Sequence, residues 1–238
     1  MVLDTVVSME DDYNMRLYSV TFDFHDVLGA GLGEDPNDFV TEHHFKIHTV
    51  PEEPSEKEAL VGRGKLSLIQ FGLAMDAEFP LRDVMDASST ILAMSESLFS
   101  WEEDVHPFEK LDKYFENDPI FNADVCFVEQ LEILPAFRGQ GIGRAALISI
   151  ARKFHNSCGL LVLKAFPLQH EARLPGKVDQ WVKAMRYDEL DQDLERSRLK
   201  LNSWYQEMGF TNPFDLEYFI ARPEEYACLP MFVKYNSL

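Results

Sequence analysis

Residues 131–144 read Leu-Glu-Ile-Leu-Pro-Ala-Phe-Arg-Gly-Gln-Gly-Ile-Gly-Arg and join three kinds of local structure. An apolar, strand-like run stops at Pro135, a loop with three alternating glycines follows, and an alanine-rich helical segment continues to Arg152. Glycines let the backbone turn tightly and approach a ligand, and the first turn of a helix presents unpaired N–H groups. The segment therefore predicts a binding site for an anion, and a pyrophosphate is the ligand expected there.

The spacing of the glycines excludes two common nucleotide-binding loops. The triphosphate loop ends in Gly-Lys-Ser or Gly-Lys-Thr, whereas Gly143 is followed by Arg144 and Ala145. The dinucleotide fingerprint needs a different glycine spacing in an early strand–helix–strand unit, with an acidic residue about 20 positions later. Here the glycines alternate and the loop lies past the middle of the chain. A glycine-rich turn that binds no ligand is the alternative interpretation.

With an arginine at its head, the segment resembles the acyl-CoA signature of the GNAT superfamily of N-acyltransferases, Gln/Arg-x-x-Gly-x-Gly/Ala. In this chain the signature reads Arg138-Gly139-Gln140-Gly141-Ile142-Gly143. A second landmark lies downstream, where Tyr205, Gly209 and Phe210 match the Tyr-x-x-x-Gly-Phe pattern of a late helix in the same superfamily. The resemblance covers residues 120–220, and it extends to the N-terminal half only through the order of the predicted strands.

The resemblance implies an α/β fold with a mixed, mostly antiparallel central sheet, a splayed pair of parallel strands, and flanking helices. Strands are predicted at residues 15–22, 43–50, 62–71, 124–134, 160–167 and 216–220. Helices are expected at 143–155 and at 198–208, the second ending at a C-terminal glycine. One domain is expected over residues 1–238. The partly helical region from about 75 to 120 is expected to be an insertion before the central strand.

Composition narrows the class of protein. Of the 238 residues, 46% are hydrophobic, which is enough for a sizeable core. Three cysteines are too few and too scattered for a disulfide framework or a zinc site, and no metal is expected. No apolar run approaches the ~20 residues that a membrane span needs, so we expect a cytoplasmic protein that does not associate with membranes.

The formal net charge of −19 argues against nucleic-acid binding, which needs a basic surface. An acidic chain suits a cationic acceptor, because a cleft lined with one sign of charge concentrates the other sign. Acidic residues spread over a solvated surface explain the charge equally well. The acidic residues are densest at 52–58, 96–118 and 188–195.

The resemblance implies direct transfer of an acetyl group from acetyl-CoA to a primary amine. By position, the backbone of Leu131, Glu132 and Ile133 would hold the pantetheine arm. The backbone N–H groups that would bind the pyrophosphate belong to Arg138, Gly139, Gln140, Gly141, Ile142, Gly143 and Arg144. The side chains of the two arginines could add charge-assisted contacts to the phosphates.

The catalytic groups follow from the same chemistry. An amine must be neutral to attack a thioester, so the site needs a proton acceptor or a desolvated pocket. Tyr205 resembles the tyrosine that protonates the departing thiolate in many members, although a phenol buried beside Trp204 is the structural alternative. Glu129 is the first candidate for the base and Glu132 the second. Because strand residues alternate, Glu129 and Leu131 should share a face unless a bulge shifts the phase.

Several alternatives stay open. His106, His155 and His170 are possible bases on side-chain chemistry alone. The acceptor is a polyamine or aminoglycoside-like compound, a free amino acid, or a lysine or N-terminal amine of a protein. A module that keeps the fold but has lost catalysis, and that binds CoA or another protein, is the alternative function. The resemblance also allows a homodimer.

Overall fold

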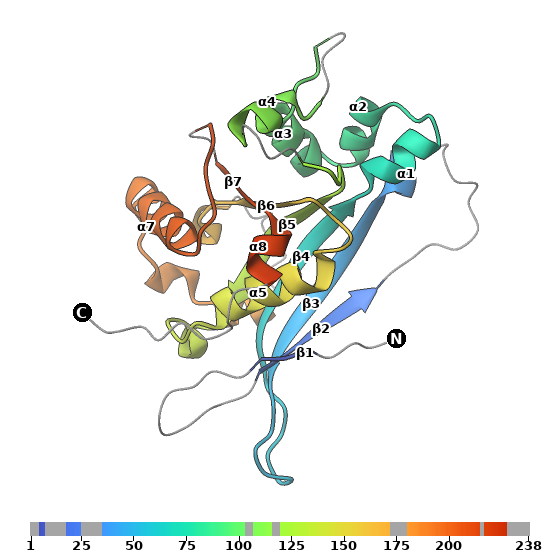
Figure 1. Cartoon of the computed structure of the whole chain (residues 1–238). Helices are drawn as coiled ribbons and strands as arrows, with labels where there is room; N and C mark the ends of the chain where they lie inside the picture. Colours follow the sequence, from blue (N-terminus) through green and yellow to red (C-terminus); the bar gives the residue numbers. More distant parts are fainter. Residues whose placement is uncertain are drawn as a thin grey trace.

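The computed structural model describes residues 5–7, 18–24, 35–102, 107–115, 120–171, 180–214 and 217–227. In these ranges one seven-stranded sheet is flanked by helices (Figure 1). The strands lie side by side in chain order: β1 (Thr5–Val7), β2 (Tyr18–Phe24), β3 (Val40–Thr49), β4 (Leu60–Ile69), β5 (Val125–Ile133), β6 (Leu160–Lys164) and β7 (Tyr218–Ala221). Neighbouring strands are antiparallel except β5 and β6, which are parallel. The predicted fold class is confirmed.

The helices complete the order of elements. The α-helices are α1 (Phe71–Asp76), α2 (Leu81–Val84), α3 (Ser89–Leu98), α4 (Glu109–Tyr114), α5 (Ile142–Phe154), α6 (Gln180–Ala184), α7 (Leu194–Glu207) and α8 (Pro223–Ala227). The 3-10 helices are η1 (Pro36–Phe39), η2 (Met85–Ala87), η3 (Pro135–Phe137), η4 (Leu168–His170) and η5 (Tyr187–Glu189). Helices α1 to α4 occupy the region between β4 and β5 that the sequence predicts as an insertion, and that interpretation stays a prediction.

Two apolar layers hold the helices against the sheet. On one face, α5 and α7 pack over β5 and β6 through side chains such as Ile148, Leu161 and Phe219. On the other face, α1 to α4 pack through Phe71, Met94 and their neighbours. Figure 1 shows α1 to α4 gathered at one end of the sheet and α5 and α8 together on the opposite side. None of the helices in the described ranges combines the length and the apolar sequence needed to cross a bilayer.

Most predicted boundaries lie within a few residues of the observed ones, and the larger differences have local causes. The strand predicted to reach residue 71 stops at Ile69, because Phe71 begins α1. Helix α7 starts four residues before the predicted Arg198, because the Asp193 side chain accepts a hydrogen bond from the Arg196 N–H and caps the helix there. Residues 15–17 and 216 of the predicted first and last strands lie outside the described residues.

The C-terminal end of α7 matches the glycine prediction. Gly209 has a φ of +93°, the left-handed conformation that ends many helices. The Tyr226 hydroxyl of α8 donates a hydrogen bond of 2.6 Å to the carbonyl of Met208 at this end. Helix α8 therefore supports the last turn of α7.

Two glycines of β4 let neighbouring strands approach closely. A Cβ added to Gly64 would lie 2.2 Å from Cζ of Phe45 and 2.4 Å from the backbone oxygen of Gln130. At Gly62 the added Cβ would lie 2.8 Å from the backbone oxygen of Glu132. The Phe45 ring of β3 thus packs directly on the backbone of Gly64, where β4 pairs with β5.

We expect Gly64→Ala to lower the free energy of unfolding by about 1–3 kcal/mol, because the methyl group overfills this position. Urea unfolding followed by circular dichroism measures the change. Gly72→Ala is the matched control. Gly72 lies in α1, and a Cβ added there would make an ordinary contact of 3.4 Å with Oδ1 of Asp124. Equal stabilities for the two variants would contradict the assignment of close packing at Gly64.

Candidate functional site

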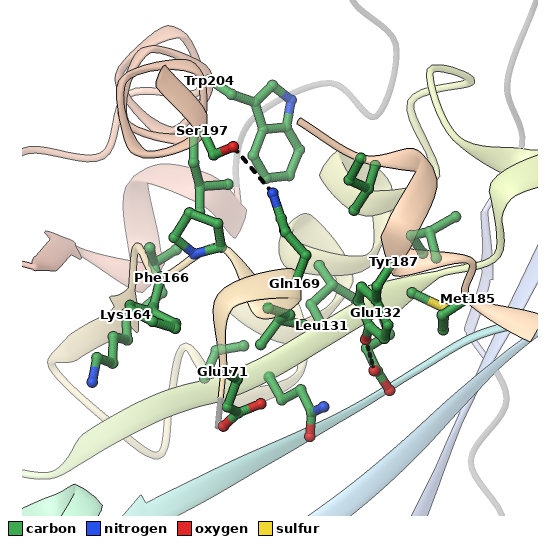
Figure 2. Close-up of a pocket in the computed structure, with 18 of the residues that line it drawn as sticks. Leu131, Glu132, Lys164, Phe166, Gln169, Glu171, Met185, Tyr187, Ser197 and Trp204 are labelled. Carbon is green, nitrogen blue, oxygen red and sulfur yellow. Dashed lines mark hydrogen bonds between the residues drawn. The ribbon is translucent and has the colours of Figure 1, made fainter. Parts of the chain in front are cut away.

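The parallel pair of strands separates halfway along β5. Pairing with β6 runs from Val125 opposite Leu160 to Val128 opposite Leu163 and ends there. Strand β5 continues to Ile133 and stays paired with β4 on its other side. A cavity of about 1070 Å³ lies at this separation, lined by the open part of β5, the end of β6, the glycine loop and α7. The sheet therefore provides a groove beside an unpaired strand edge, as the resemblance predicts (Figure 2).

A β-bulge at Glu129 shifts the alternation of the β5 side chains between the two faces of the sheet. In the β4–β5 register, Lys65 pairs with Gln130 and Leu66 pairs with Val128, so Glu129 is the extra residue. Val128 and Leu131 therefore both pack in the apolar layer beneath α5. The Glu129 carboxylate instead binds side chains of β4. The bulge that the sequence analysis allows for is therefore present, and because of it Glu129 and Leu131 do not share a face.

Because the backbone groups of a strand alternate in direction, the residues of β5 whose backbone groups point into the gap can be identified. The carbonyl oxygens of Gln130 and Glu132 lie close to Gly64 and Gly62 and therefore point toward β4. Successive carbonyls of a strand point in opposite directions, so the backbone groups of Leu131 and Ile133 point toward the gap. Of the three residues predicted to hold pantetheine through their backbone, Glu132 thus directs its backbone groups at β4 and not into the gap.

The glycine loop has the conformation that only glycine adopts readily. Gly139 and Gly141 have φ values of +74° and +76°. Gly141 is also the residue that precedes the first turn of α5, and in the described part of the chain no side chain caps that turn. At Gly143 an added Cβ would lie 3.3 Å from Cη2 of Trp204, so α5 and α7 touch here. The first turn of α5 thus lies where the sequence predicts donors for an anion, and their binding of an anion stays a prediction.

The two arginines of the signature have different surroundings. The Arg138 guanidinium donates to the carbonyl oxygens of Ile133 at 2.9 Å and Met185 at 2.7 Å. Arg138 thus ties the loop to the strand before it and to a distant segment, a structural role that sequence reasoning did not identify. Nε of Arg144 is buried and has no hydrogen-bond partner among the described residues.

Tyr205 lies on the wall of the cavity, on α7. Its ring is packed among Trp204, Phe210 and Phe219, with centroid separations of 5.0, 6.1 and 5.5 Å. Burial raises the pKa of the Tyr205 phenol well above its ordinary value, so the hydroxyl stays protonated at neutral pH. Tyr205 is thus packed among aromatic rings and also lies on the cavity wall. A structural role for the buried phenol and a role as proton donor therefore do not exclude each other.

Glu129 also lines the cavity, and β4 holds its carboxylate on both oxygens. The Ser67 hydroxyl donates to one oxygen at 2.5 Å, and the Lys65 ammonium lies 3.2 Å from the other. Burial alone would lower the pKa of Lys65, but its hydrogen bond to Glu42 and the charge of Glu129 raise that pKa above its ordinary value. Lys65 therefore stays charged. Neither Lys65 nor Ser67 stands out in the sequence, because the bulge that brings them to Glu129 is a tertiary feature.

Glu132 is buried, with its side chain 2% exposed. Its carboxylate accepts hydrogen bonds from Nε of Arg63 at 2.7 Å, from Nε1 of Trp181 at 2.9 Å, and from the Tyr187 hydroxyl. Figure 2 shows Tyr187 directed at this carboxylate beside Met185. The donors come from β4, α6 and η5. Trp181 and Tyr187 lie between β6 and α7, outside the two motifs that carry the resemblance.

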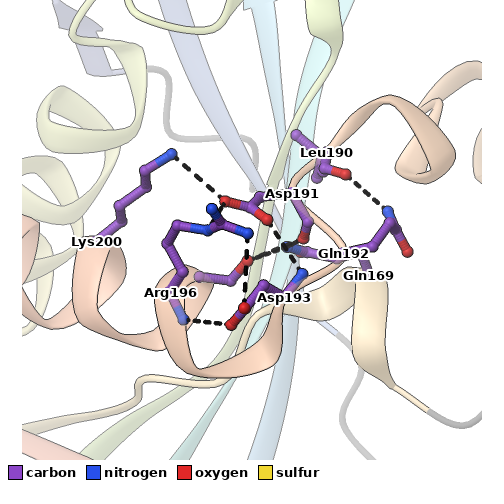
Figure 3. Close-up of polar contacts among 8 residues, drawn as sticks. Gln169, Leu190, Asp191, Gln192, Asp193, Arg196 and Lys200 are labelled. Atoms are coloured by element: carbon purple, nitrogen blue, oxygen red, sulfur yellow. Dashed lines mark hydrogen bonds and ion pairs between the residues drawn. The ribbon is translucent and has the colours of Figure 1, made fainter.

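A second polar network holds the start of α7 over the cavity (Figure 3). The Gln169 amide donates to the Asp191 carbonyl at 3.2 Å and to the Ser197 hydroxyl at 3.1 Å. The Asp191 carboxylate pairs with Arg196 at 2.8 Å and with Lys200 at 3.8 Å. These pairs neutralise part of the acidic run at 188–195, which lies beside the cavity.

The histidines contribute little to the site. Nδ1 of His155 lies 2.8 Å from the carbonyl of Arg152 at the end of α5. Neither His155 nor His170 is among the described residues that line the cavity. His106, the third candidate, lies outside the described residues.

Solved structures similar to this chain include a KacTA–DNA complex, with a TM-score of 0.35, 11% identity, and coverage of 94% of this chain and 96% of that chain. A tyrosine-to-phenylalanine mutant of KacT has a TM-score of 0.36 and 12% identity, over 87% of this chain and 96% of that chain. AtaTR bound with AcCoA has a TM-score of 0.36 and 10% identity, over 87% and 95%. No protein-family model and no curated protein matches the sequence. At these values the similarity identifies neither an activity nor a partner of this chain.

Proposed function

We propose that this protein is an acetyl-CoA-dependent N-acetyltransferase that transfers an acetyl group directly to a primary amine. One observation carries the proposal. The groove where β5 leaves β6 is lined by Arg138 and Gly139 of the glycine loop, just ahead of the uncapped start of α5, and Tyr205 and Glu129 lie on its walls. An unpaired strand edge, the beginning of a candidate anion-binding loop and possible acid–base groups therefore lie around one cavity.

The chain's own groups fit acetyl-CoA. The gap-facing backbone of Leu131 and Ile133 can pair with an extended amide-bearing arm as another strand would. One of these acceptors is shared, because the Ile133 carbonyl already accepts a hydrogen bond from Arg138. The N–H groups from residue 139 to residue 144 suit a pyrophosphate, and Gly139 and Gly141 leave the approach free of side chains. The Arg138 N–H is already used, because it donates to the Pro135 carbonyl at 3.3 Å. The cavity is large enough to hold a ligand of this kind.

Acetyl-CoA, when bound, supplies an acetyl group activated as a thioester. Glu129 would accept the proton that the amine loses, directly or through a water molecule. Backbone N–H groups facing the gap would stabilise negative charge on the reacting carbonyl oxygen. Tyr205, whose phenol is protonated at neutral pH, would donate a proton to the leaving sulfur. We favour Glu129 over Glu132 as base because the Glu132 carboxylate is buried and already accepts three hydrogen bonds.

The lining of the cavity bears on the acceptor. Among the described residues that line it, four side chains are basic (Lys65, Arg138, Lys164 and Lys200) and four are acidic (Glu129, Glu132, Glu171 and Asp191). This balance contrasts with the formal charge of −19 for the whole chain. We therefore propose a protonatable primary amine as the acceptor, and we do not favour a polycation among the candidates.

Gly141→Glu should raise the Kd for acetyl-CoA at least about a hundredfold. The side chain is strained at a φ of +76°, and its charge repels a phosphate at the helix start. Isothermal titration calorimetry measures the affinity, with Gly141→Asn as the control that keeps the left-handed conformation without adding charge. Unchanged affinity of the glutamate variant would remove the loop from the proposed donor site.

Tyr205→Phe should lower kcat by about a hundredfold or more while changing the Kd for acetyl-CoA little, because only the proton donor is lost. Release of free thiol with a panel of amines measures the rate. Since the pKa of Tyr205 is raised above its ordinary value of 10.0, the wild-type rate should show no loss from phenol ionisation up to that pH. A variant as fast as the wild type would exclude the phenol as the acid.

Glu129→Gln should lower kcat at least about tenfold at neutral pH, because the amide cannot accept the proton. Glu171→Gln is the matched control, since Glu171 also lines the cavity but is exposed. Equal effects of the two changes would contradict the base assignment. If the wild-type protein binds acetyl-CoA but releases no thiol with any amine, the catalytically inactive CoA-binding module is the better description.

A further inference from the structure

Glu132 joins parts of the chain that are far apart in sequence. Its carboxylate belongs to β5, and its three donors are Arg63 of β4, Trp181 of α6 and Tyr187 of η5. The Arg63 guanidinium also lies over the Trp181 ring, 4.8 Å from its centroid. One buried charge therefore fastens residues 181–187 to the centre of the sheet.

This segment forms part of the cavity wall. Met185 and Tyr187 line the cavity together with the open part of β5 and with Arg138 and Gly139. Arg138 provides a second attachment, because it donates to the Met185 carbonyl at 2.7 Å. Residues 181–187 are thus attached to β4, to β5 and to the first residue of the glycine loop, while Gln192 also donates to the Tyr187 carbonyl at 3.0 Å.

The wall segment contains a turn that needs such support. Arg186 connects α6 to η5 with φ 45° and ψ 54°, the left-handed conformation that is unfavourable for a residue with a side chain. Strained backbone persists only where the surrounding structure holds it. Arg138 binds Met185 on one side of Arg186, and Glu132 binds the Tyr187 hydroxyl on the other. Local contacts add to these, because Gln192 donates to the Tyr187 carbonyl and Arg186 pairs with Glu189.

We propose that Glu132 is a positioning residue, which holds residues 181–187 in place as a wall of the groove proposed for acetyl-CoA and takes no proton in the reaction. The placement of this wall beside Arg138 assigns it to the donor end, which rests on the proposed function. The carboxylate suits the task because one of its oxygens accepts from both Arg63 and Trp181, and the other accepts from the Tyr187 hydroxyl. An amide in its place would remove the buried negative charge that pairs with the Arg63 guanidinium.

The first test is structural and needs no ligand. Hydrogen–deuterium exchange of the free protein should show amide exchange in residues 181–190 about tenfold faster in Glu132→Gln than in the wild type, with exchange in α5 unchanged. Tyr187→Phe removes one donor and leaves the carboxylate intact, so it should give a smaller increase in the same peptides. Glu171→Gln, which changes another cavity carboxylate, should give none. Unchanged exchange in both Glu132→Gln and Tyr187→Phe would overturn the proposal.

The second test separates positioning from catalysis. Glu132→Gln and Tyr187→Phe should both raise the Kd for acetyl-CoA, by about tenfold and severalfold, with kcat at saturating substrates within about threefold of the wild type. The dependence of kcat on pH should keep its shape. A large loss of kcat in Glu132→Gln alone, with unchanged affinity and exchange, would make Glu132 a catalytic base instead. If the wild type does not bind acetyl-CoA, the proposed function fails while the exchange experiment still decides the role of Glu132.

Discussion

The separation of β5 from β6 is the constraint on which the rest of the site depends. The two strands pair only as far as Val128 and Leu163, and beyond that point β5 pairs with β4 alone within the described ranges. Unpaired backbone groups inside a folded domain must be satisfied by some other partner. The chain meets part of that demand itself, because Arg138 donates to the Ile133 carbonyl. The remaining edge is the feature of the sheet best suited to an extended ligand.

Local patterns were sufficient to predict the framework. The glycine loop, the helix after it and the glycine that ends α7 depend on backbone conformations that only a few residue types adopt, so the sequence identifies them directly. The site depends on longer-range features. The bulge at Glu129 arises from how β4 and β5 pair, and no residue pattern within β5 predicts it. Trp181 and Tyr187 donate to Glu132 although they lie 49 and 55 positions away from it in the sequence. Their partnership is visible only once the chain has folded.

The electrostatic character of the chain is a property of its surface more than of its cavity. Inside the cavity, ion pairs such as Lys65 with Glu129 and Lys200 with Asp191 balance the charges. The acidic run at 188–195 is held partly by Arg196, and the run at 52–58 lies in the connection between β3 and β4. Net charge therefore describes the outer surface of this protein well and predicts poorly what its cavity prefers.

The hydrogen bond from Tyr226 to the Met208 carbonyl bears on how the chain can be shortened. Helix α8 looks peripheral, yet its tyrosine holds the end of α7 three residues beyond Tyr205. Trimming the protein before Pro223 would release that carbonyl and uncover the ring of Phe210, which packs against both tyrosines. The smallest unit that preserves the geometry around Tyr205 therefore extends at least through α8, past the last strand of the sheet.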